Sequence, residues 1–277
     1  MSNLKGDLFG GITAAVIALP LALAFGVASG AGAIAGIYGA IVLGFFASLF
    51  GGTPTQISGP TGPMTVVTAS AVALFANDMN AVMAVILLTG VFQIIFSISK
   101  IGKYVKYIPY PVISGFMSGI GLIIIILQIN PFLGVSGYGS VLESLYHLPD
   151  TVNNMNIQAI IIATCTLFIM LYTPKKVSKI IPTALIALVL MTFVSILFKF
   201  DINTIGQIPT SLPAFKVPYF DVLQLKQIIT LAITLALLGS IDTLLTSLVA
   251  DSVTKTKHNS NKELFGQGLG NMVVSLI

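Results

Sequence analysis

The chain has 277 residues, of which 56% are hydrophobic and only 8% are charged, and its formal net charge is +4. Soluble domains carry about 25% charged residues, and a water-soluble fold of this size could not keep so much apolar surface inside. This composition excludes a soluble enzyme, a disordered segment and a nucleic-acid-binding domain. All 13 cationic residues are lysines that lie between apolar runs rather than on one basic face, so the positive charge does not indicate nucleic acid binding.

Apolar runs of about 18 or more residues are long enough to cross the ~30 Å hydrocarbon core of a bilayer as helices. In chain order, such runs cover residues 8–29, 32–50, 81–98, 109–128, 157–173, 180–198 and 225–250. A shorter run covers residues 62–76, and a last one begins near residue 264 and continues to Ile277. The pattern predicts an all-α, polytopic membrane protein with eight crossings and the start of a ninth. Because no cap, breaker or charge follows the last run, we expect an N-terminal fragment of a longer protein.

The lysines between these runs predict the orientation. If successive segments alternate sides, ten lysines lie on the side of the N-terminus, and three, Lys199, Lys216 and Lys226, lie on the other. Lysine-rich loops remain in the cytoplasm. We therefore expect an integral protein of the plasma (inner) membrane with a cytoplasmic N-terminus. The distribution is consistent only if residues 62–76 also cross.

The stretch from Gly51 to Pro63 contains three prolines and four glycines and cannot form a regular helix. A helical pattern follows from Pro63 onwards, since proline suits the first turn of a helix. Interrupted segments of this kind hold substrates in secondary transporters, because the N-terminus of a half-helix offers free N–H groups and partial positive charge to an anion. Together with two nearby hydroxyl groups, this predicts a binding site for a small anion at Thr61, Gly62, Pro63 and Thr65. The alternative is a long cytoplasmic loop followed by an ordinary short helix.

An acidic residue, Asp242, lies well inside the apolar run 225–250. A carboxylate at the centre of a bilayer costs roughly 2.5–3.5 kcal/mol on insertion scales, so it needs a partner. Thr246 lies four residues on and shares its helical face. A carboxylate and a hydroxyl are oxygen ligands that suit Na⁺, whereas the carboxylate alone could carry a proton. A structural role, as a cap at a helix break or a bond to a neighbouring helix, is the alternative.

Sequence patterns typical of nucleotide-hydrolysing or metal-dependent enzymes are missing from the chain. It has no phosphate-binding loop, no zinc-ligand spacing and no nucleophile elbow. We therefore expect no enzymatic activity and no organic cofactor.

Four stretches resemble the sulfate permease (SulP) family: residues 6–20, 57–65, 110–121 and 261–271. Within the family, residues 22–32, 60–67 and 241–251 look like its BicA-type, sodium-dependent bicarbonate transporters, and the likeness runs over nearly the whole chain. The resemblance implies fourteen membrane segments in two inverted repeats of seven, divided into core and gate domains and usually followed by a cytoplasmic STAS domain. It implies that residues 1–277 are an incomplete transport domain, with the first repeat at about 1–200, the start of the second at about 220–277, and a STAS domain outside this chain.

The same resemblance implies roles for individual residues. Thr61 matches the threonine that contacts substrate at the break of the third segment, and Asp242 and Thr246 match the sodium ligands of the bicarbonate-transporting members. In the family the broken tenth segment faces the third across the substrate and supplies further ligands to both sites; it lies outside this chain.

We therefore expect uptake of a small inorganic anion coupled to Na⁺, with bicarbonate favoured. The alternatives are a proton-coupled sulfate or dicarboxylate symporter in which Asp242 carries the proton, an uncoupled anion channel, and a membrane scaffold that does not transport. The expected partners are the anion and the lipid bilayer but no nucleic acid, and a homodimer is left open.

Overall fold

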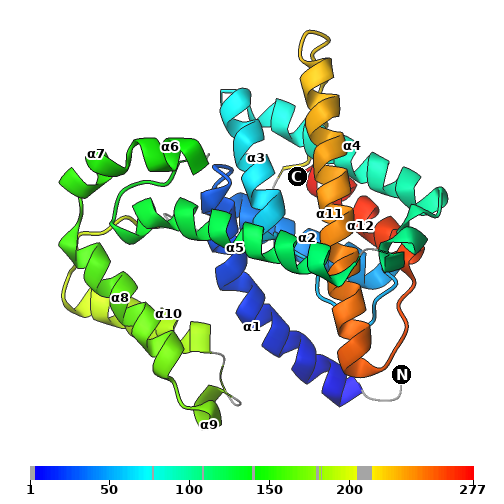
Figure 1. Ribbon diagram of the computed structural model, residues 1–277. Coiled ribbons are helices and arrows are strands. Elements are labelled where there is room, and N and C mark those ends of the chain that lie inside the picture. The colour runs from blue at the N-terminus through cyan, green and yellow to red at the C-terminus, as the bar shows by residue number, and fades with distance from the viewer. Residues whose placement is uncertain are drawn as a thin grey trace.

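The computed structural model describes residues 4–76, 78–107, 109–138, 141–178, 181, 183–204 and 214–277. All regular elements in these ranges are helices (Figure 1). They are α1 (Leu4–Ala28), α2 (Ala33–Phe50), α3 (Gly62–Leu74), α4 (Met79–Ile98), the 3₁₀ helix η1 (Ile101–Tyr107), α5 (Tyr110–Phe132), α6 (Val141–Tyr146), α7 (Leu148–Asn153), α8 (Ile157–Tyr172), α9 (Lys175–Ser178), α10 (Thr183–Leu197), α11 (Leu225–Thr254) and α12 (Ser260–Val274).

Each predicted apolar run contains a helix. Among the described residues, α1, α2, α4 and α11 are long and apolar enough to cross a membrane by length and composition. The helices α3, α8 and α10, and residues Ser118–Phe132 of α5, are apolar but shorter. The all-α architecture is thus confirmed, and the count of eight crossings stays a prediction.

One predicted boundary was wrong, and two short helices were not predicted. The last helix was expected to begin near residue 264 and to continue to Ile277, but α12 begins at Ser260 and ends at Val274. Its start depends on a cap, because the Asn259 side chain accepts a hydrogen bond from the N–H of Lys262. No helix was predicted between residues 129 and 156, where α6 and α7 lie. The hydroxyl of Thr151 on α7 donates to Asn130 Oδ1 on α5 at 2.8 Å, a tertiary contact that no local pattern reveals.

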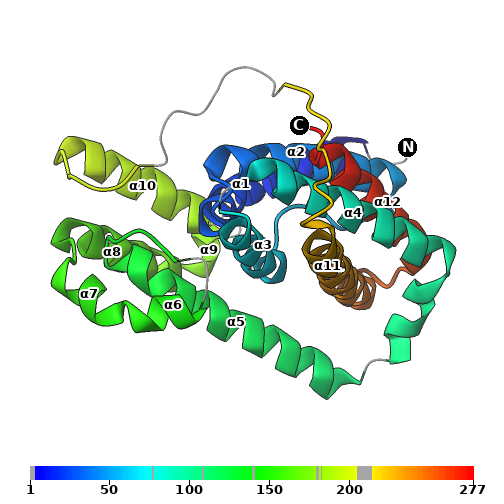
Figure 2. The ribbon, with the colours of Figure 1, turned by 90° about the horizontal axis from the view of Figure 1, so that it is seen from above.

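The helices form two groups joined by α5 (Figures 1 and 2). One group contains α1, α2, α3, α4, α11 and α12, in which α12 packs against both α4 and α2, and α11 packs against α3 and α4. In the other group α8 pairs with α10, and α6 and α7 lie nearby. The first group holds the residues that the sequence predicts for binding.

Small residues set the spacing in the first group. Its apolar core joins α3, α4 and α11 through buried side chains, many of them alanine or valine: Ala71, Val72, Phe75, Ala81, Val82, Ala84, Val85, Ile228, Ala232 and Leu235. At the crossing of α4 and α12, a Cβ atom built on Gly90 would lie 2.5 Å from the carbonyl oxygen of Gly268. Two backbones that approach this closely tolerate only glycine, as is common between membrane helices.

Replacing Gly90 with alanine should therefore destabilise the protein by about 1–3 kcal/mol, because the added methyl group meets backbone and the Met272 side chain, 2.6 Å away. The matched control is Gly119→Ala on α5, where an added Cβ meets nothing within 4 Å and alanine is the better helix former. The thermal midpoint of the purified protein in detergent measures both. Equal midpoints for the two variants would contradict the close crossing.

Candidate functional site

The broken segment consists of irregular backbone over residues 51–61 and a helix, α3, that begins at Gly62. Thr61 is the N-cap residue, with extended backbone (φ −125°, ψ 157°), yet its side chain makes no capping bond. The N–H and the hydroxyl of Thr65 both donate to the carbonyl oxygen of Thr61, at 2.9 and 2.8 Å. Pro63 has no N–H, so the first-turn donors without an intrahelical partner are the N–H groups of Gly62 and Met64. The helix start is thus a set of donors suited to an anion.

A cavity of about 140 Å³ lies against this helix start. Its walls are mainly apolar, and none of the described residues that line it is charged. Its polar lining consists of hydroxyl groups and one amide: Ser29, Thr61, Thr65, Thr68, Thr89 and Asn271. The volume is well below the ~300–1,000 Å³ of pockets for drug-sized ligands. The hydroxyl groups of Ser29, Thr65 and Thr89 already donate to backbone carbonyl oxygens. A small inorganic ion fits such a space, and the Thr61 hydroxyl and the N–H groups of the α3 start are the donors that suit it.

The structure brings the predicted anion site and the predicted cation site together at Thr61. Asp242 on α11 is buried, with 8% of its surface exposed, and its carboxyl group interacts with the Thr61 hydroxyl. The Thr61 hydroxyl is buried and has no regular hydrogen-bond partner among the described residues. Leaving such a group unpaired costs about 1–3 kcal/mol, which favours a bound ligand at this point.

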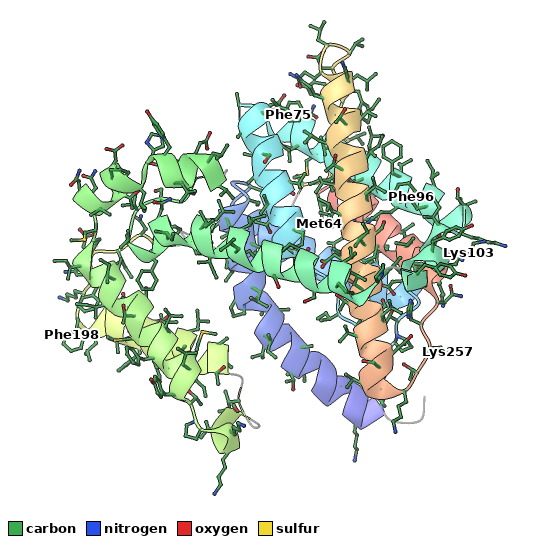
Figure 3. The ribbon with its side chains drawn as sticks, viewed as in Figure 1. Met64, Phe75, Phe96, Lys103, Phe198 and Lys257 are labelled. Atoms are coloured by element: carbon green, nitrogen blue, oxygen red, sulfur yellow. The ribbon has the colours of Figure 1, made fainter. Side chains whose placement is uncertain are left out.

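Close packing of α11 on α3 makes this juxtaposition possible. Met64, in the first turn of α3, lies between the two helices (Figure 3). A Cβ atom on Gly239 of α11 would lie only 2.9 Å from the Met64 sulfur. Gly239 lies one turn before Asp242, so the absence of its side chain lets the carboxyl group approach the start of α3.

Thr246 occupies a different environment from Asp242. It is exposed, and its hydroxyl donates to the Asp242 carbonyl oxygen at 2.9 Å rather than to the carboxylate. The two residues share a helix face, as the spacing predicts, but the hydroxyl is engaged with its own helix. Among the described residues, no three His, Cys, Asp or Glu side chains gather into a metal-binding group.

Sequence reasoning missed a second buried acid, Glu263 on α12, which is 2% exposed. It lies four residues after the N-cap Asn259 and accepts hydrogen bonds from three residues around the broken segment. Its position in a polar stretch before an apolar run makes it look like a surface residue. Its burial follows from the packing of α12 against α2 and α11, so the sequence carried no clear signal for it.

The loop between α11 and α12 is held by a set of short contacts. His258 Nδ1 lies 2.7 Å from Asp251 Oδ2, and the His258 N–H donates to the same oxygen at 3.0 Å. The other ring nitrogen of His258 lies 2.9 Å from the Ser260 hydroxyl at the start of α12. These contacts fix where α12 begins and so help to place Glu263.

Comparison with known proteins identifies the family. The profile of the sulfate permease family matches residues 4–277. The chain is 53% identical over 282 residues to the bicarbonate transporter BicA of Synechocystis sp., covering 99% of this chain and 50% of that protein. It is 34% identical over 284 residues to the putative sulfate transporter YvdB of Bacillus subtilis, covering 100% of this chain and 53% of that protein. The chain thus spans about half the length of the curated relatives it matches.

Solved structures agree with this fold. The transmembrane domain of a cyanobacterial bicarbonate transporter BicA superposes with a TM-score of 0.92 at 52% identity, over 99% of this chain and 72% of that chain. The murine Solute Carrier 26 family member A9 anion transporter in its inward-facing state gives a TM-score of 0.81 at 22% identity, over 99% and 50%. The second match shows the fold alone. The chain belongs to the sulfate permease family, and the relatives named above are transporters and not enzymes.

Proposed function

We propose that the chain is part of a secondary transporter that takes up a small inorganic anion, with bicarbonate favoured, together with Na⁺. The observation that carries the proposal is the meeting of Thr61 and Asp242 beside the donors of the α3 N-terminus. Support for bicarbonate comes from the relative at 53% identity, which is named a bicarbonate transporter. In this proposal residues 1–277 are an incomplete transport domain, with a first repeat at about 1–200 and the start of a second at about 220–277.

The shared hydroxyl gives a physical reason for coupling. Thr61 has one hydroxyl proton, and an ionised Asp242 beside it attracts that proton and repels an anion. At 4 Å, two unit charges interact by roughly 4 kcal/mol at an effective dielectric constant of 20. A Na⁺ ion at Asp242, with Thr246 as a further oxygen ligand, would offset the carboxylate charge. The Thr61 hydroxyl could then donate to an anion that also meets the N–H groups of the α3 start, so each ion would favour binding of the other.

A proton-coupled sulfate or dicarboxylate symporter is the second candidate. Two observations favour keeping it: the Thr246 hydroxyl is engaged with the helix backbone, and a relative at 34% identity is named a putative sulfate transporter. In that case Asp242 would carry a proton, and the pairing of its carboxyl group with Thr61 would link protonation to anion binding.

The orientation of the N-terminus toward the cytoplasm is also part of the proposal. The start of α1 and the end of α11 lie at the same lower end of the molecule in Figure 1. Lysines lie at both places, Lys5 in the first turn of α1 and Lys255 and Lys257 after α11, which supports placing them on one side. Lys257 lies in the loop that leads from α11 to α12 (Figure 3).

Bicarbonate uptake by the native gene product in proteoliposomes tests the function directly. We expect labelled bicarbonate uptake that requires an inward Na⁺ gradient and is insensitive to excess sulfate. Uptake that follows a pH gradient and is blocked by sulfate would favour the second candidate instead. Conductance without saturable uptake would contradict both.

Thr61→Val should raise the anion KM by about tenfold or stop uptake, because it removes a buried donor without changing the shape of the side chain. Thr65→Val is the matched control, since the Thr65 hydroxyl already donates to the Thr61 carbonyl oxygen and is not free for a ligand. Its KM should change by less than that of Thr61→Val. Equal kinetics for wild type and Thr61→Val would show that this hydroxyl does not bind the anion.

Asp242→Ala should abolish Na⁺-dependent uptake without reducing the amount of protein in the membrane, because it removes the charge that the cation neutralises. Uptake is measured against external Na⁺ concentration, and membrane level by immunoblot. Sodium activation that matches wild type would refute the assignment of Asp242.

The orientation can be checked by labelling introduced cysteines in a Cys165→Ser background, since Cys165 is exposed. An impermeant thiol reagent added outside intact cells should label Lys216→Cys but not Lys257→Cys. Labelling of Lys257→Cys from outside would reverse the proposed topology.

A further inference from the structure

The extended half of the broken segment, residues 51–58, is held in place by side chains of α11 and α12. An irregular stretch leaves backbone and side-chain polar groups without helical partners, and inside a membrane protein these must bond to other protein groups. Four residues of the stretch, Gly52, Thr53, Gln56 and Ser58, bond to side chains of these two helices. We call this set of contacts the polar clamp.

Glu263 is the centre of the polar clamp. Its Oε2 accepts from the Gly52 N–H at 2.9 Å, and its Oε1 accepts from Gln267 Nε2 at 3.1 Å and from the Thr243 hydroxyl at 3.3 Å. The Gly52 carbonyl oxygen in turn accepts from the Asn259 N–H at 3.0 Å. A Cβ on Gly52 would lie 2.1 Å from the Asn259 carbonyl oxygen, so only glycine allows this approach.

The bonding pattern suits a side chain with two oxygens that accept hydrogen bonds. All three partners of Glu263 present donors, and no lysine or histidine forms an ion pair with it in the part of the chain that the structure describes. Hydrogen bonds from N–H and O–H donors can stabilise a buried carboxylate, and these charge-assisted bonds are stronger than neutral ones. A glutamine here would turn its amide N–H₂ toward at least one of these donors.

The hydrogen bond from Thr243 to Glu263 determines how Thr243 bonds to the next residue of the polar clamp. Since Thr243 has one hydroxyl proton and donates it to Glu263, its oxygen is free to accept from Gln56 Nε2 at 2.8 Å. The Ser247 hydroxyl is completely buried, and its one proton faces two acceptors, Gln56 Oε1 and the Thr243 carbonyl oxygen, each at 2.8 Å. The Thr53 hydroxyl lies 2.8 Å from Ser247 and can donate to it. One carboxylate therefore sets the direction of the bonds that Thr243 makes with Glu263 and with Gln56.

The clamp is adjacent in sequence to both proposed ligand residues. Thr243 directly follows Asp242 on α11, and Ser58, which accepts from Gln267 Nε2 at 2.5 Å, lies three residues before Thr61. Glu263 is not among the described residues that line the 140 Å³ cavity, so it acts on the site through its neighbours. The clamp spans the two elements whose separation decides whether Thr61 lies beside Asp242.

We propose that Glu263 is a positioning residue: its carboxylate fixes the extended half of the broken segment against α11 and so sets the distance between Thr61 and Asp242. This inference rests on the proposed function. It predicts that loss of the carboxylate affects the anion and the cation together, because both bind where those two residues meet.

The test compares Glu263→Gln with wild type in proteoliposomes containing the native gene product, with uptake measured against bicarbonate and against Na⁺. We expect the bicarbonate KM and the half-saturating Na⁺ concentration each to rise about tenfold. Changes of this size are typical when a residue that orients the ligand-binding groups is lost. The maximal rate per reconstituted molecule should change much less. A residue needed only for folding would lower the amount of active protein and leave both constants unchanged.

Thr151→Val is the matched control for a lost buried hydrogen bond. Thr151 on α7, in the group of α8 and α10, is 1% exposed and bonds Asn130 on α5, so this variant should lower the thermal midpoint without changing either constant. If Glu263→Gln does not reach the membrane, Gln56→Met tests the proposal instead. It removes the clamp contacts to Thr243 and Ser247 and leaves Glu263 in place. We expect the same joint rise in that variant.

If the bicarbonate KM and the half-saturating Na⁺ concentration are unchanged in a folded Glu263→Gln protein, the positioning role is overturned while the proposed function stays intact. The same result in Gln56→Met has the same meaning where Glu263→Gln does not reach the membrane. A wild-type protein that takes up no bicarbonate under a Na⁺ gradient would overturn the proposed function, and this inference with it.

Discussion

Polar groups in the interior of a membrane protein must find partners within the protein, and this constraint governs the arrangement around the broken segment. The backbone of residues 51–61 is not helical, so the polar groups of this stretch need hydrogen-bond partners from α11 and α12. Glu263, Thr243 and Gln267 supply those partners from two helices that are far from the segment in sequence. Extended backbone that is fixed in this way can present the donors of a helix start to a ligand without collapsing onto its neighbours.

Close helix packing makes the fixed arrangement possible. Gly90 and Gly268 let α4 and α12 touch, and Gly266 lets α12 approach the end of α2, where an added Cβ would lie 2.6 Å from the Gly51 backbone nitrogen. Gly239 does the same for α11 and α3. Because dispersion contacts and interhelical hydrogen bonds drive association in lipid, small residues at crossings contribute directly to stability. The same crossings bring Asp242 to Thr61 and Glu263 to Gly52, at the two ends of the broken segment.

The proposed coupling follows from having one hydroxyl serve two ligands. Thr61 caps α3 without using its side chain, and its hydroxyl lies between an apolar cavity and the Asp242 carboxyl. A donor with a single proton can favour either the carboxylate or an anion. A cation or a proton at Asp242 would therefore decide whether the Thr61 hydroxyl donates to the carboxylate or to an anion. This links cation binding to anion binding without a large movement of the backbone.

The sequence by itself determined the membrane class, the positions of the apolar helices, the break before Pro63 and the buried acid Asp242. These follow from local properties: long apolar runs, proline and glycine chemistry, and a charge inside an apolar segment. Membership of the sulfate permease family, inferred from short stretches, is confirmed by the match over residues 4–277.

Only the tertiary structure decided which of these residues meet. The contact between Thr61 and Asp242 joins positions 181 residues apart along the chain, and no periodicity encodes it. The burial of Glu263 depends on how α12 packs on α2 and α11, since its sequence neighbours Lys262 and Asn261 are typical of a surface. The direction of the Thr246 hydroxyl was likewise set by competition between its own helix backbone and the carboxylate, which spacing alone could not resolve.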